Sequence, residues 1–81
     1  MDFIRQILKK EIPDLTPNWP ATRPSEIMNF PTWRAIVAKI EVAARAAFQK
    51  PDFRVTAKET AEYYGRPLSE FVALLQEKLK S

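Results

Sequence analysis

Few side chains in this sequence are reactive, and their types limit the chemistry available to it. The chain has no cysteine and no histidine, which removes thiolate nucleophiles, imidazole bases and the commonest zinc ligands. Its carboxylates, Asp14 and Asp52 among them, show no pairing typical of acid/base catalysis or metal binding, and one glycine is too few for a phosphate-cradling loop. We therefore expect no catalytic residue, no metal and no cofactor, and a protein that is not an enzyme.

The cations are the remaining candidates for a binding role, and they are unevenly distributed. The formal net charge is +3, and residues 32–50 carry four basic side chains against one acidic, whereas residues 51–81 carry five of each. An anionic partner would therefore respond most strongly to segment 32–50. Its basic residues are Arg34, Lys39, Arg45 and Lys50. A solvated helix face is the simpler interpretation of this secondary basic face, and a phosphate-contacting surface is the alternative.

Length and composition indicate one soluble domain spanning residues 1–81. A chain of 81 residues supports one core and not two, and a hydrophobic content of 46% is enough to build it. The N-terminal stretch MDFIRQILKKEI has charges inside its apolar run, and no later run approaches bilayer length. We expect neither a signal peptide nor a membrane span, and the absence of cysteine agrees with a cytoplasmic location.

The first part of the chain is predicted to form a helix followed by a proline-rich strap. Ile4, Ile7 and Leu8 have helical spacing, which predicts a helix over residues 1–12 that ends at proline 13. Residues 13–31 hold five of the seven prolines together with Trp19. Large apolar residues are unusual in a solvated linker, so we expect an extended strap pinned across the helices. Ser25 is a candidate cap for one short turn within it.

The rest of the chain reads as three further helices. The longest apolar stripe begins at Trp33 and predicts a helix over residues 32–50, in which the i,i+4 spacing of Glu41 and Arg45 favours an ion pair. Thr56 and Glu59 have capping-box spacing, so the third helix begins there. We expect Gly65 to end it in a left-handed conformation, and proline 67 to open a fourth helix that reaches residue 79. The predicted fold is all-α, with four helices and a strap.

The pair of helices within residues 56–79 resembles the helix-turn-helix of bacterial DNA-binding proteins, a group that includes phage repressors and excisionase-like regulators. The resemblance covers residues 56–75, about a quarter of the chain, and matches Ala61, Gly65, Phe71 and Leu74. In that family a small residue lets the two helices cross closely, the glycine makes the bend, and apolar anchors hold the second helix with its N-terminal part toward the major groove. A helical hairpin that only closes the core is the competing interpretation.

The resemblance implies a small DNA-binding or accessory protein in transcription regulation, and it assigns the contacts. Arg66, Ser69 and Gln76 could donate hydrogen bonds to bases or phosphates, and Lys58 would help to hold phosphate. Because a single small DNA-binding domain has limited affinity for DNA, the resemblance also implies a homodimer.

The alternative hypothesis is a non-enzymatic protein-protein interaction module or a small subunit of a larger complex. Under it, the first helix or the strap would meet the partner through Ile4, Leu8 and Trp19. Packing of the first helix on the domain's own core is the simpler interpretation of its apolar stripe. The sequence leaves DNA and a protein partner both open.

Overall fold

The computed structural model describes residues 2–13 and 18–80, and within them the chain is built of helices and loops with no strand. The helices, in chain order, are α1 (Asp2–Glu11), α2 (Pro24–Ile27), α3 (Phe30–Phe48), α4 (Ala57–Tyr64) and α5 (Leu68–Lys80). The predicted all-α class is confirmed. In the described part of the chain, every helix is too short or too polar to cross a membrane.

The strap is shorter than predicted, because the helix that follows it, α3, begins earlier in the chain than expected. Asn29 caps α3 by accepting a 2.9 Å hydrogen bond from the Thr32 N–H, so Phe30 and Pro31 belong to the helix. Pro31 is tolerated in the first turn, where a missing N–H costs nothing. The short turn is present as α2, but it follows Arg23, and the predicted cap Ser25 lies inside it. Residues 14–17 of the predicted strap lie outside the described residues.

The end of the second predicted helix and the conformation of Gly65 also differ from expectation. The predicted second helix ends at Phe48 instead of residue 50, because Gln49 adopts a left-handed conformation with φ of 52° and its N–H bonds the Arg45 carbonyl. Gly65, in contrast, has φ of −99° and ψ of 10°, so the expectation of a left-handed glycine is wrong. The turn between α4 and α5 therefore does not need the conformational freedom of glycine.

The α4 cap matches the sequence pattern. The Thr56 hydroxyl accepts from the Glu59 N–H at 3.1 Å, and the Glu59 carboxylate accepts from the Thr56 N–H at 3.0 Å. The Lys78 ammonium lies 3.0 Å from the same carboxylate. Partial burial alone would raise the pKa of Glu59, but the Thr56 N–H and Lys78 together outweigh it and lower that pKa.

Trp33 is the centre of the core. Its side chain is fully buried, its indole N–H donates a 2.8 Å hydrogen bond to the Thr60 carbonyl of α4, and its ring meets the edge of Phe71 of α5 with centroids 4.9 Å apart. One side chain thus joins three helices. Burial of its apolar surface and satisfaction of its polar N–H both stabilise the same packing.

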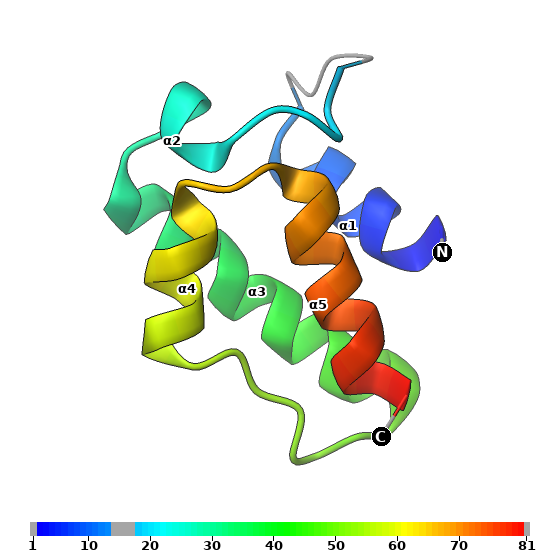
Figure 1. Cartoon of the computed structure of the whole chain (residues 1–81). Coiled ribbons are helices and arrows are strands. Elements are labelled where there is room, and N and C mark those ends of the chain that lie inside the picture. Colours follow the sequence, from blue (N-terminus) through cyan, green and yellow to red (C-terminus); the bar gives the residue numbers. More distant parts are fainter. Residues whose placement is uncertain (1, 14–17, 81) are drawn as a thin grey trace.

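Helices α1 and α4 pack against α3, whereas α2 packs against α4, and α5 packs against α4 and meets α3 through the contact of Phe71 with Trp33 (Figure 1). In that view α4 and α5 run in opposite directions, and their far ends are linked by the Glu59–Lys78 ion pair. Contacts between Phe3 and Phe48 at one end, and Glu11 and Lys39 at the other, show that α1 runs antiparallel to α3.

Trp33→Phe is expected to lower the free energy of unfolding by about 2 kcal/mol, because the Thr60 carbonyl loses its indole donor and the smaller ring leaves a void. Trp19→Phe is the matched control, since Trp19 is half-buried and its indole makes no hydrogen bond within the described residues. We expect the control to cost under about 1 kcal/mol. Urea unfolding followed by circular dichroism measures both, and equal losses would contradict a central role for Trp33.

Stability is expected to fall as the pH drops toward 4 and below, partly because of Glu59. A carboxyl whose pKa is lower in the folded state stabilises the fold above its unfolded pKa, and loses that contribution as it protonates. Glu59→Gln should therefore show a smaller loss of unfolding free energy between pH 7 and pH 3 than the unchanged chain. Urea titrations at the two pH values test this, and an unchanged pH dependence would exclude Glu59 as a contributor.

Candidate functional site

The four predicted DNA-contacting residues are spread over α4, the following turn and α5. Lys58 is exposed in the first turn of α4, Arg66 lies in the turn after that helix, and Ser69 and Gln76 lie on α5. Lys58 and Arg66 are at opposite ends of α4, because Lys58 lies in its first turn and Arg66 follows its last residue. The fold brings Arg66 and Ser69 near the same turn and leaves Lys58 apart from them.

Arg66 is engaged within the fold. Its guanidinium lies 2.8 Å from the Glu62 carboxylate and 3.3 Å from the Glu70 carboxylate, and it covers the Tyr63 ring at 5.4 Å from the centroid. Each ion pair has i,i+4 spacing, so one cation joins the end of α4 to the start of α5. A phosphate approaching Arg66 would compete with two carboxylates and be repelled by them.

The strap occupies the N-terminal end of α5. The Leu68 N–H donates to the Thr22 carbonyl at 2.9 Å, and the Ser69 N–H donates to the Pro20 carbonyl at 3.0 Å. These two N–H groups have no partner inside α5, because the first turn of a helix leaves its donors free. The strap therefore supplies, from a distance in sequence, the cap that α5 lacks locally. The same donors are no longer available to an anion.

The residues that carry the helix-turn-helix resemblance differ in how far they are buried. Phe71 is fully buried and Leu74 is partly buried against the core, as expected of apolar anchors. Ala61 is exposed, so the close helix crossing that the resemblance implies at this position is not made there. Thr60, one residue earlier, is buried and carries the carbonyl that Trp33 bonds.

The secondary basic face is largely used for internal contacts. Lys39 pairs with Glu11 at 3.1 Å, Arg45 pairs with Glu41 at 3.4 Å, and Lys50 is half-buried. Arg34 is exposed and makes no hydrogen bond or ion pair within the described residues. The cations of α3 therefore do not form one bare surface, and Arg34 differs from the others.

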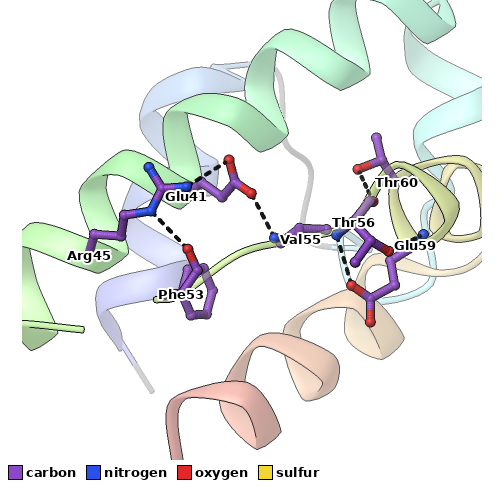
Figure 2. Close-up of polar contacts among 7 residues, drawn as sticks. All are labelled: Glu41, Arg45, Phe53, Val55, Thr56, Glu59 and Thr60. Carbon is purple, nitrogen blue, oxygen red and sulfur yellow. Dashed lines mark hydrogen bonds and ion pairs between the residues drawn. The ribbon is translucent and has the colours of Figure 1, made fainter. Parts of the chain in front are cut away.

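Glu41 and Arg45 hold the segment between α3 and α4 in place (Figure 2). The Glu41 carboxylate accepts a 2.7 Å hydrogen bond from the Val55 N–H, and Arg45 Nε donates at 2.8 Å to the Phe53 carbonyl. The i,i+4 ion pair between them, predicted from spacing, is confirmed. The hydrogen bonds of these two side chains to the loop backbone could not be predicted from the sequence, because the loop and the helix meet only after folding.

The structure buries two of the three partner-binding residues of the alternative hypothesis, in agreement with the simpler interpretation of the first helix. Ile4 and Leu8 are 1% and 0% exposed, so α1 buries its apolar stripe in the domain's own core. Trp19 is half-buried against that core, with the Arg5 guanidinium 5.2 Å from its ring centroid. Ile4 and Leu8 are therefore inaccessible to a partner in this fold.

A different apolar surface is exposed on the side of α3 that faces away from the core. Four exposed residues at helical spacing line it, and we call them the outer face of α3: Ala35, Ala38, Val42 and Ala46. Val42 is 61% exposed, and the other large apolar side chain exposed in the described residues is Ile27 at 47%. The sequence does contain a signal for this surface, since Val42 lies on the opposite side of the predicted helix from Trp33, Ile36 and Ile40.

Two open hollows border the outer face of α3. The first has a volume of about 300 Å³ and lies between α3 and α4, with Phe30, Arg34 and Val55 in its lining. The second has a volume of about 560 Å³ and lies at the end of α3, lined by Val42, Arg45, Ala46, Gln49 and Pro51. Both hollows are open to solvent, and apolar side chains form much of their lining.

No family model, no curated protein and no solved structure matches this chain.

Glu41→Ala is expected to lower the free energy of unfolding by about 1 to 3 kcal/mol, because the Val55 N–H loses its acceptor in a partly buried site. Glu70→Ala removes an exposed ion pair of Arg66 and should cost at most about 0.5 kcal/mol. Hydrogen exchange at the Val55 amide should accelerate in the first variant alone. Equal exchange in both variants would contradict the anchoring role of Glu41.

Proposed function

We propose that this chain is a non-enzymatic protein-protein interaction module, a small subunit that docks on a larger partner through the outer face of α3. The observation that carries the proposal is the 61% exposure of Val42 in the middle of an apolar helix face. Exposing a β-branched side chain to water loses the stabilisation that its burial would bring. Contact with a partner would recover it.

The internal contacts of the predicted DNA-contacting region also favour an interaction module over a DNA-binding protein. Arg66 is paired with two carboxylates, and the first N–H groups of α5 are bonded to the strap. An interaction surface on α3 requires none of these contacts to break. It also leaves the core of Trp33 and Phe71 intact, so docking needs no rearrangement of the domain.

DNA binding is the other hypothesis, and it stays a prediction. It would rely on Lys58, Arg66, Ser69 and Gln76, or on Arg34 and the rest of the secondary basic face. Such binding would weaken steeply as salt rises, since phosphate contacts release counterions. Docking through the outer face of α3 should depend on Val42 and much less on salt. A cytoplasmic location likewise stays a prediction from composition.

The test is affinity purification of the tagged full chain from its own cells after nuclease treatment, with Val42→Asp compared against Ile27→Asp. Both variants place a carboxylate at an exposed large apolar position, so they change charge and solubility alike. We expect a partner that is retained by the unchanged chain and by Ile27→Asp and that falls at least about tenfold with Val42→Asp.

Partners lost equally from both variants would contradict the proposal. Retention that disappears on nuclease treatment, together with salt-sensitive binding of a fluorescent random-sequence duplex, would instead support the DNA hypothesis. Circular dichroism of each variant confirms that the fold is kept.

A further inference from the structure

A hollow lies where the loop after α3 meets the last turn of α5. Its volume is about 390 Å³, and three cations are part of its lining: Lys50, Arg54 and Lys78. Asp52 contributes a carboxylate to the same lining. We propose that this hollow binds a phosphate dianion, either free or as the monoester of a small organic molecule. The site does not include Val42, so it is independent of the proposed function.

The three cations come from segments that are far apart in the sequence. Lys50 and Arg54 lie in the loop between α3 and α4, and Lys78 lies in the last turn of α5. Like charges repel, so gathering three of them around one hollow costs free energy unless anions balance them. Asp52 balances one charge, and Glu59, 3.0 Å from the Lys78 ammonium, balances part of another. The hollow therefore keeps a net positive charge, which a dianion would neutralise.

The helix ends account for the two lysines but not for the arginine. Free carbonyls at the C-terminal end of a helix attract cations, and Lys50 and Lys78 lie at the ends of α3 and α5. Arg54 is six residues beyond the end of α3, is exposed, and makes no hydrogen bond or ion pair within the described residues. Its guanidinium is therefore able to bond two oxygens of an incoming phosphate at once.

The loop that carries Arg54 is held in place by the residues on either side of it. The Phe53 carbonyl accepts a 2.8 Å hydrogen bond from Arg45 Nε (Figure 2). The Val55 N–H donates at 2.7 Å to the Glu41 carboxylate, and both loop residues bury their side chains in the core. A ligand at Arg54 would therefore order one side chain and not a whole loop, which lowers the entropic cost of binding.

The number and types of donors favour phosphate over a carboxylate. A phosphomonoester presents three terminal oxygens and close to two negative charges at neutral pH, whereas a carboxylate has two oxygens and one charge. One guanidinium fork and two ammonium groups match the larger set. An ammonium has three N–H donors, so Lys78 has donors beyond the one directed at Glu59. The volume of the hollow also leaves room for an organic group attached to the phosphate.

The probes are inorganic phosphate and phenyl phosphate, each titrated into the isotope-labelled full chain at pH 8 and constant ionic strength. Amide chemical shifts in residues 49–54 and at the end of α5 should change and saturate, with a dissociation constant of about 1 mM or below. Phenyl sulfate carries one charge and should bind at least about threefold more weakly than phenyl phosphate. Tighter binding of phenyl phosphate than of inorganic phosphate would assign the site to an organic ester, and the reverse order to the free ion.

Arg54→Gln should weaken the binding of phenyl phosphate about fivefold or more, since it removes a charge-assisted pair of hydrogen bonds. Arg34→Gln is the matched control, because Arg34 is also exposed, makes no hydrogen bond or ion pair within the described residues, and lines a different hollow. The control makes the same change in net charge and should leave the affinity unchanged. Arg54→Lys keeps the charge and loses the fork, so its affinity should lie between those of Arg54→Gln and the unchanged chain.

Equal weakening by Arg54→Gln and Arg34→Gln would show that the anion responds to net charge alone, and would overturn this inference. Chemical shifts that do not saturate, or equal affinities for phenyl phosphate and phenyl sulfate, would overturn it too. A random-sequence DNA duplex that binds at residues 49–54 more tightly than either phosphate probe would assign these cations to DNA instead. None of these results depends on Val42, so failure here leaves the proposed function standing.

Discussion

The fold depends on the burial of Trp33 with its indole N–H bonded to the Thr60 carbonyl. A buried indole without an acceptor would cost free energy, so this bond fixes the distance and rotation of α4 relative to α3. The edge contact of the same ring with Phe71 places α5. Once these three helices are set, the remaining elements have little freedom in where they pack.

The proline-rich strap completes this arrangement in place of a local cap. Carbonyls of Pro20 and Thr22 accept from the first amides of α5, and the Tyr64 hydroxyl donates to the Met28 carbonyl at 2.8 Å. Pro20 lies in a turn, not in the extended segment that was predicted, since the Ala21 N–H donates to the Asn18 carbonyl and the Thr22 N–H to the Trp19 carbonyl. The strap therefore ties the α4–α5 turn to the N-terminal half of the domain.

The number of basic residues in a segment of this chain is a poor guide to the charge that the segment presents to a partner. Residues 32–50 are strongly basic in sequence, yet Lys39 and Arg45 pair with Glu11 and Glu41 in the fold, and Arg66 pairs with Glu62 and Glu70. Pairing reduces the field that a distant anion feels, while exposed apolar area keeps its free-energy cost. For this reason we propose the outer face of α3 as the interaction surface, and not the basic residues around it.

The sequence by itself determined the helical segments, the α4 capping box and the Glu41–Arg45 pair, because these depend on residues within one or two turns of each other. It did not determine that Phe30 and Pro31 join α3 or that Gly65 avoids the left-handed region. Burial of Ile4 and Leu8 in the core was the simpler of two interpretations that the sequence left open. Only the tertiary structure decided which cations are paired and which apolar face stays exposed, since both depend on contacts between segments far apart in the chain.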